Sequence, residues 1–184
     1  MRKKGFAILC AVFIFTAGCS AREDVPAGIS RVEECSFSLK QISLFDEKTG
    51  WALSSENQVL FTEDGPESFS VIREIPGTGS QMPGPVSAAF PDEHTAYTAY
   101  FSPDQVHLIV ESTADRGASW QQTSIEYSSL CDSCDAGKAY LDFTDSRKGY
   151  LPYCSTPAAG KMTKILLRTA DGGKSEGQLY TAVP

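Results

Sequence analysis

Residues 113–120 read TADRGASW, and the residue types in this stretch suit either a reactive site or a tight turn. A short acidic side chain can accept hydrogen bonds from nearby backbone N–H groups, and a glycine supplies the positive φ at which a chain reverses. Two related stretches are present, TEDGPESF at 62–69 and TADGGKSE at 169–176. Because the pattern occurs three times, we interpret it as a structural element of a repeat and not as a unique reactive site.

Each of these stretches closes a longer segment with the same order of features. The segment begins with an apolar stretch ending in phenylalanine, continues through a polar turn to an aromatic residue, and then enters an apolar run. The apolar runs read QVLFT, VHLIVEST and KILLRT, and the aromatic residues are Trp51, Tyr97 and Tyr150. The phenylalanines lie 45 and 53 residues apart, at Phe45, Phe90 and Phe143. Periods of about 40–50 residues are typical of a four-stranded propeller blade.

The local pattern within the segments is typical of β-strands. The apolar runs are short, rich in Val, Ile, Tyr, Phe and Thr, and bounded by Gly, Pro, Asp and Ser. No segment has a sustained 3.6-residue period. The sequence therefore predicts an all-β fold, a partial or open β-propeller-like array of about three four-stranded blades. The expected repeats cover about 42–76, 86–127 and 140–184, within a repeat domain at 31–184.

The eight-residue pattern resembles the Asp box of bacterial neuraminidase (BNR) repeats. Together with the preceding Phe-x-Asp…Gly-Trp element, it is similar to the β-propellers of the photosystem II assembly-factor-like family and the sialidase superfamily. The resemblance implies that the box closes the hairpin between the last two strands of a blade and that its aspartate is structural, not catalytic. The first box has Pro66 in place of the glycine, and the third has Glu176 in place of the aromatic residue. The predicted structural residues are Thr62, Asp64, Phe69, Thr113, Asp115, Gly117, Ser119, Trp120, Thr169, Asp171, Gly173 and Ser175.

The first residues predict export. Three basic residues precede the run FAILCAVFIF, which is too short to cross a bilayer, and the run is followed by TAGC, ending at Cys19. This exit resembles the lipobox of bacterial lipoproteins, with Thr16 where leucine is usual. The resemblance implies a signal peptide at 1–18, a diacylglycerol on Cys19, a tether at 19–30 and an extracytoplasmic protein anchored to the bacterial cell membrane. A soluble secreted protein, cleaved just before Cys19, is the alternative.

The charge balance narrows the range of partners. The chain has 16 Lys and Arg residues against 23 Asp and Glu residues, which gives a formal net charge of −7 at pH 7. Because phosphate contacts require Lys and Arg, nucleic acid is not an expected partner. An acidic surface also argues against electrostatic docking on anionic lipid, so we expect the membrane to be contacted through the lipid anchor.

Outside the leader and the proposed lipidation site, the cysteines are Cys35, Cys131, Cys134 and Cys154. The CxxC spacing of the middle pair suits redox chemistry or half of a zinc site. A second CxxC is missing, the two histidines stand alone in the sequence, and the pair has acidic neighbours, which do not lower a thiol pKa. Outside the cytoplasm these thiols most simply form disulfides, for example from the pair to Cys154, while free thiols and a metal or redox role stay open. We predict no metal site and no cofactor.

These observations favour a non-catalytic binding or scaffold module at the cell surface, with a protein or glycan partner, because loops on a rigid scaffold carry specificity. A sialidase-like glycan hydrolase is the alternative. It would need convergent Arg, Tyr and acidic side chains, and the Arg-Ile-Pro element of sialidases does not precede the boxes. A truncated fragment of a larger propeller is a third hypothesis, because about four to eight blades close a propeller. Open sheet edges also predict self-association.

Overall fold

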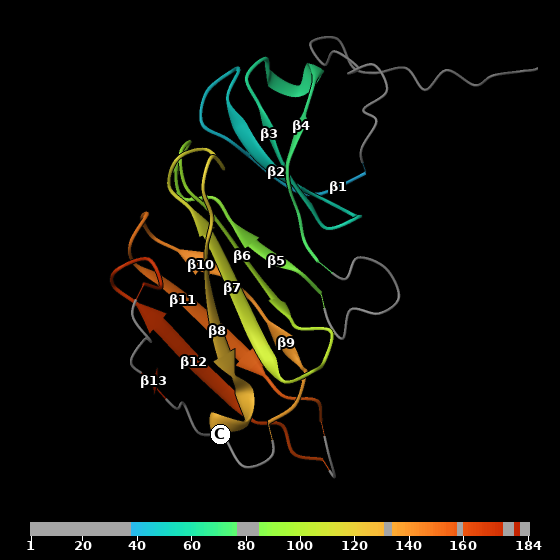
Figure 1. Cartoon of the computed structure of the whole chain (residues 1–184), viewed down its shortest axis with the longest axis vertical. Coiled ribbons are helices and arrows are strands. Elements are labelled where there is room, and N and C mark those ends of the chain that lie inside the picture. The colour runs from blue at the N-terminus through green and yellow to red at the C-terminus, as the bar shows by residue number, and fades with distance from the viewer. Residues whose placement is uncertain (1–37, 77–84, 131–133, 158–159, 175–178, 181–184) are drawn as a thin grey trace, which may run out of the picture. The chain divides into compact units, whose positions relative to one another are not determined.

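The computed structural model describes residues 38–76, 85–130, 134–157, 160–174 and 179–180. These residues belong to one compact unit, Val32–Pro184, and form three antiparallel β-sheets (Figure 1). Helical structure within the described ranges is limited to two short 3₁₀ turns, at Gly65–Glu67 and Tyr127–Ser129. The all-β class predicted from the sequence is therefore confirmed. In this part of the chain, no helix is long and apolar enough to cross a bilayer.

Within each sheet the strands lie in the order in which they occur along the chain. The first sheet consists of β1 (Leu39–Leu44), β2 (Gly50–Ser54), β3 (Gln58–Thr62) and β4 (Ser70–Glu74). The second consists of β5 (Ser87–Ala89), β6 (Ala96–Phe101), β7 (His107–Thr113) and β8 (Gln121–Glu126). The third consists of β9 (Lys138–Ala139), β10 (Asp142–Phe143), β11 (Gly149–Cys154), β12 (Lys164–Thr169) and β13 (Leu179–Tyr180).

The extra strand of the third sheet comes from a broken first strand. β10 pairs with the beginning of β11, where Phe143 lies opposite Gly149, and β9 pairs with its end, where Lys138 lies opposite Cys154. β9 and β10 together therefore occupy the place of β1 and β5 in the other sheets. Each sheet is an antiparallel meander that corresponds to one expected repeat.

Strand β6 of the second sheet is buried on both faces. Successive side chains of a strand point to opposite faces, and all six residues of β6, AYTAYF, are buried. Ala96 and Tyr100 belong to a core cluster shared with the first sheet, whereas Ala99 and Phe101 belong to one shared with the third. A strand covered on both sides reads as a continuous apolar run, which is what the sequence has here.

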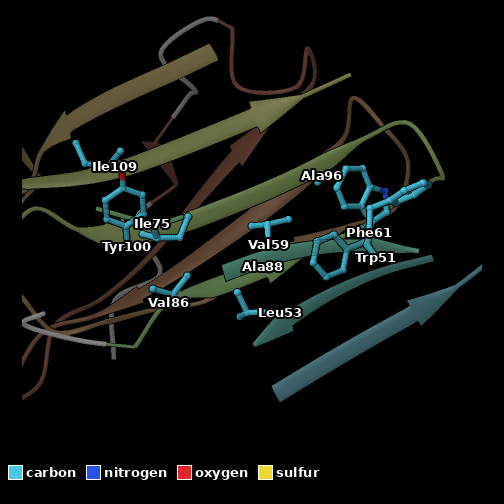
Figure 2. Close-up of a cluster of buried hydrophobic side chains, with 11 residues drawn as sticks. Trp51, Leu53, Val59, Phe61, Ile75, Val86, Ala88, Ala96, Tyr100 and Ile109 are labelled. Carbon is cyan, nitrogen blue, oxygen red and sulfur yellow. The ribbon is translucent and has the colours of Figure 1, made fainter. Parts of the chain in front are cut away.

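Aromatic side chains dominate the core between the first and second sheets (Figure 2). The ring of Trp51, on β2, stacks on Phe90 at a centroid distance of 5.9 Å and tilts against Phe61 at 4.7 Å. Ring pairs in such geometries add to the stability gained from area burial alone. The remaining buried members of this cluster are Leu53, Val59, Ile75, Val86, Ala88, Ala96, Tyr100 and Ile109.

The core between the second and third sheets repeats one feature of the first. Tyr97, which corresponds to Trp51, stacks on Phe143 at 3.8 Å, just as Trp51 stacks on Phe90. The aromatic residue of one repeat therefore contacts the phenylalanine of the next. A separate cluster of buried residues lies in the same core: Ala99, Phe101, Leu108, Ala139, Leu151, Tyr153, Ile165 and Leu167.

The two aromatic residues at the ends of this series are exposed. Tyr150, the last of the aromatic residues, is 42% exposed, and Phe45, the first of the phenylalanines, is 39% exposed. The three-sheet array is thus open at both ends of the stacking series.

Candidate functional site

The box stretches lie at the hairpins that join β3 to β4, β7 to β8 and β12 to β13. In the second box, Asp115 Oδ1 accepts hydrogen bonds from the Thr113 hydroxyl at 2.8 Å and the Ser119 amide at 2.9 Å. The Ser119 hydroxyl donates to the other carboxylate oxygen at 2.6 Å. These bonds, the Ser119 hydroxyl first, lower the pKa of Asp115 below its usual value. Both carboxylate oxygens of Asp115 therefore accept hydrogen bonds from residues of the same turn.

Gly117 is required by both conformation and space. Its φ is +85°, and a Cβ atom at this position would lie 2.0 Å from Cγ2 of Ile72 on β4. Its amide donates to the Thr113 hydroxyl at 2.9 Å. The second box therefore lies directly against the first sheet.

The other two boxes keep part of this geometry. The first holds Asp64 with Thr62 and Ser68, and Phe69 is half-buried, but Pro66 cannot adopt a positive φ and the turn forms a 3₁₀ helix. The third has Asp171 Oδ1 2.9 Å from the Thr169 hydroxyl, while Thr169 accepts from the Gly173 amide at 2.7 Å. Ser175 and Glu176 lie outside the described residues.

The aromatic residue of the second box fills space between two sheets. Trp120 packs against the first core cluster, and the Arg73 guanidinium of β4 lies 5.5 Å from the centre of its ring. Arg73 also forms an ion pair, at 2.5 Å, with Glu111 of β7, whose side chain is only 1% exposed. Burial, and next the Glu111 carboxylate, raise the pKa of the neighbouring Tyr100 to about 12.

Tyr100, Glu111 and Arg73 are the residue types that a sialidase site would use. They are nevertheless part of the core: Tyr100 is 4% exposed, and none of the three lines either of the two cavities described below. A buried charge is stable only when paired, so this cluster is best explained as an ion pair that fixes the first sheet against the second.

A cavity of about 710 Å³ lies between the second and third sheets. Its apolar wall combines side chains of both sheets: Tyr97, Val110, Ile125, Leu130, Leu141, Phe143, Leu151 and Leu167. Its polar margin contains His107, Thr123, Ser124, Glu126, Ser129, Arg168 and Thr169. We refer to this cavity as the cleft. Mostly apolar walls with a few polar groups, in a volume of about 300–1,000 Å³, are typical of ligand sites.

The cleft adjoins the third box. Thr169 and Gly173 line it, and the Gly173 carbonyl accepts a 2.8 Å hydrogen bond from the Thr123 hydroxyl of β8. The third box therefore contacts the second sheet through this hydrogen bond, whereas the second box contacts the first sheet through Gly117 and the Ile72 side chain.

A second cavity, of about 470 Å³, lies between the second and third boxes and is more polar. Asp115, Asp171, Arg147 and Lys174 contribute charged groups to it. The Asp115 carboxylate already accepts hydrogen bonds from Ser119 and Thr113, so we do not treat it as a group that is available to bind a ligand in this cavity.

The cysteines do not form the bridge to Cys154 that the sequence suggested as one arrangement. Cys154 is a free cysteine, while Cys134 is disulfide-bonded. Cys19, Cys35 and Cys131 lie outside the described residues. Within the described ranges, no group of three or more His, Cys, Asp or Glu side chains could hold a metal ion.

Sequence reasoning singled out some residues of the cleft lining as repeat or box residues, but it did not predict a cleft: Tyr97, Phe143, Tyr150, Thr169 and Gly173. Val110, Thr123, Ile125 and Leu151 read as ordinary strand residues, because nothing in one strand shows which neighbouring sheet leaves space beside it.

No family model matches the chain, and no curated protein matches it. Among solved structures it is similar to the structure titled "YCF48 bound to D1 peptide", with a TM-score of 0.51 and 17% sequence identity. The similarity covers 78% of this chain and 39% of that chain, so the chain spans about two fifths of that protein's length. The fold is therefore that of a partial, open β-propeller-like array of three blades.

Proposed function

We propose that this protein is a non-catalytic binding module that receives an extended protein segment in the cleft between the second and third sheets. The observation that carries the proposal is the cleft itself, about 710 Å³ in volume, with apolar walls and polar groups along its margin. Such a lining buries apolar side chains and leaves hydrogen-bonding groups for the backbone of a bound segment.

Two further observations support a protein segment as the ligand. The cleft runs along β8, the edge strand of the second sheet, through Thr123, Ser124, Ile125 and Glu126. An exposed edge strand is where an extended peptide adds to a sheet. The structure of YCF48, to which the fold is similar, is one of that protein bound to a peptide.

The proposal includes the membrane anchor. A diacylglycerol on Cys19 and the tether at 19–30 would hold the module outside the cytoplasm and leave its sheets free of the bilayer. Self-association through open sheet edges is a further proposal, supported by the exposed Phe45 and Tyr150 at the two ends of the stacking series.

Selection of peptides tests the binding role. The leaderless chain from Ser20, which keeps the whole compact unit Val32–Pro184, is immobilised and offered a displayed library of random twelve-residue peptides. We expect selected peptides to bind Ile125→Asp, which places a charge in the cleft wall, at least tenfold more weakly. Val71→Asp is the matched control, because Val71 is 42% exposed on the first sheet and does not line the cleft.

Circular dichroism, recorded as each variant is heated, checks that both variants are folded under the binding conditions. Equal loss of peptide binding in the two variants, or no loss in either, would contradict a binding site in the cleft.

A further inference from the structure

We infer that a bound segment adds to the second sheet as a further strand, antiparallel to β8, along the cleft. The geometry of this edge also specifies the side-chain pattern of the segment: a basic residue, an apolar residue, any residue and a second apolar residue. This inference rests on the proposed binding function and deepens it, because it states how the cleft recognises its ligand.

β8 is the edge strand that is least protected against pairing. Within the described ranges, the last strand of each sheet has a neighbour on one side only. β4 has a register shift in its pairing with β3, and β13 is two residues long. β8, in contrast, pairs with β7 over six residues without a shift and contains neither lysine nor proline. Bulges, short strands, lysine and proline are features that protect an edge, so β8 is open to a further strand.

The backbone of β8 presents every second residue to the free side. In an antiparallel strand the N–H and C=O groups of one residue point to the same neighbour, and successive residues alternate. The His107 carbonyl of β7 accepts from the Ser102 amide at 2.8 Å, so His107 points towards β6. The β7 residues that point towards β8 are therefore Leu108, Val110 and Ser112, which lie opposite Ile125, Thr123 and Gln121. The β8 residues that point away from β7 are Gln122, Ser124 and Glu126.

Two of these three residues have both backbone groups available. The Glu126 carbonyl accepts from the Ser129 hydroxyl at 2.5 Å. In the part of the chain that the structure describes, no backbone hydrogen bond joins Gln122 or Ser124 to a residue on the free side. An antiparallel strand placed there forms two backbone hydrogen bonds with each of them. Strand addition therefore pairs the polar backbone groups that this edge leaves over.

The side chains of β8 alternate between the cleft and the opposite face. Thr123 and Ile125 face the third sheet, because the Thr123 hydroxyl donates to the Gly173 carbonyl at 2.8 Å and Ile125 packs against the second core cluster. An added strand continues this alternation. Its residues opposite Thr123 and Ile125 point into the cleft, whose walls are mostly apolar, so we expect apolar side chains there. Its residues opposite Gln122 and Ser124 point away from the cleft and are not selected by it.

Glu126 supplies the charge that orders the pattern. It is exposed at the end of β8, and one of its carboxylate oxygens accepts from the Ser128 hydroxyl at 2.6 Å. Opposite charges directly across two strands attract one another, and the net charge of −7 favours a basic partner at longer range. In an antiparallel addition, the ligand residue opposite Glu126 precedes those opposite Ile125, Ser124 and Thr123. The segment therefore reads basic, apolar, any residue, apolar from its N-terminal end.

The acetylated and amidated peptide GSKVTITGS is the probe. Its lysine is designed to lie opposite Glu126, and its valine and isoleucine to face the cleft. The ¹⁵N-labelled leaderless chain is titrated with it and followed by ¹H–¹⁵N correlation spectra. We expect saturable shifts that centre on β8, and at saturation an exchange of the Ser124 amide proton with D₂O that is at least tenfold slower.

Two N-methylated peptides form the matched pair. A methyl group on the nitrogen of the first threonine, opposite Ser124, removes a donor to β8 and should weaken binding at least tenfold. A methyl group on the isoleucine nitrogen, opposite Thr123, lies on the side away from β8 and should leave binding within twofold. Both measurements use the unchanged protein, so they do not depend on the folding of a variant.

A charge exchange tests the end of the pattern. Glu126→Lys should weaken the binding of GSKVTITGS at least fivefold, and the peptide GSEVTITGS should recover the lost affinity. Glu67→Lys makes the same change of charge at an exposed acid of the first box and should leave binding within twofold. Equal weakening by the two substitutions would overturn the proposed pair with Glu126.

Other outcomes overturn strand addition itself. Equal effects of the two N-methyl groups would do so, as would an absence of saturable shifts or shifts that centre away from β8. Slow exchange of the Ser124 amide without peptide, increasing with protein concentration, would show that a second copy of the chain occupies the edge instead.

The peptides selected from the random library separate this inference from the proposed function. Selected peptides that are lost in Ile125→Asp but tolerate N-methylation at every position would overturn strand addition and leave the binding function standing. Binding of GSKVTITGS that requires β8 but is not weakened by Ile125→Asp would overturn the cleft as the binding site and leave the pairing with β8.

Discussion

At the scale of single residues, the box aspartates are explained by the hydrogen bonds of their turns. Asp115 accepts from one amide and two hydroxyl groups within eight residues of chain, and Asp64 is bonded in the same way to Thr62 and Ser68. Both aspartates have a lowered pKa, chiefly because a serine hydroxyl stabilises the carboxylate. These carboxylates accept the hydrogen bonds that hold a reversal of the chain.

Asp115→Ala should lower Tm by a few degrees, because the turn loses its acceptor while Thr113 and Ser119 lose a partner. The folded state favours the carboxylate, so this stabilisation is present above the unfolded pKa and is lost as pH falls through the lower folded value. The difference in Tm should therefore be clear at pH 7 and smaller near pH 2. Differential scanning calorimetry measures these Tm differences, with Glu67→Ala, which removes an exposed acid of the first box, as the control. Equal changes in Tm for the two variants would show that only the net charge matters.

At the scale of elements, one core cluster joins the first and second sheets and another joins the second and third sheets. Between the first and second sheets, Trp51, Trp120 and the Arg73–Glu111 pair fill the interface. Between the second and third sheets, the second core cluster packs beside the cleft.

The buried cluster of β4, β6 and β7 predicts a response to alkaline pH. The pKa of Tyr100 is raised to about 12, so the folded state holds its proton more tightly than the unfolded chain, with a tyrosine pKa of about 10. The stabilisation is complete below pH 10 and is lost as pH rises toward 12. Urea unfolding should show a loss of about 2 kcal/mol across this window that is absent in Tyr100→Phe. Identical pH profiles for the two proteins would count against the buried cluster.

At the scale of the whole molecule, three blades stack in a series that is open at both ends. Each internal step pairs an aromatic residue with the next phenylalanine, as in Trp51 with Phe90 and Tyr97 with Phe143. Tyr150 and Phe45 are the exposed ends of that series. The likeness to YCF48 shows the same fold over about two fifths of that protein.

Cys19→Ala tests how the whole molecule is held at the membrane. In a bacterial host we expect the unchanged chain to incorporate labelled palmitate and to sediment with membranes, because two acyl chains suffice for stable anchoring. The variant should incorporate no label and should keep its leader, since the lipidated cysteine is the proposed processing site. Cys154→Ala, which removes the free cysteine of β11, is the control. Normal processing and labelling of Cys19→Ala would show that the anchor is wrong.

The sequence by itself determined the β-class and the order of the three repeats. These features depend on local chemistry: turn residues at fixed offsets, and short apolar runs rich in Val, Ile, Tyr, Phe and Thr. The family resemblance added the structural reading of the box aspartates.

Only the tertiary structure decided which side chains from different repeats meet. The pairing of Arg73 with Glu111 and the cleft beside Thr123 and Gly173 both depend on the space left between sheets. That space is set by the summed volumes of side chains on facing strands, which lie far apart in the chain.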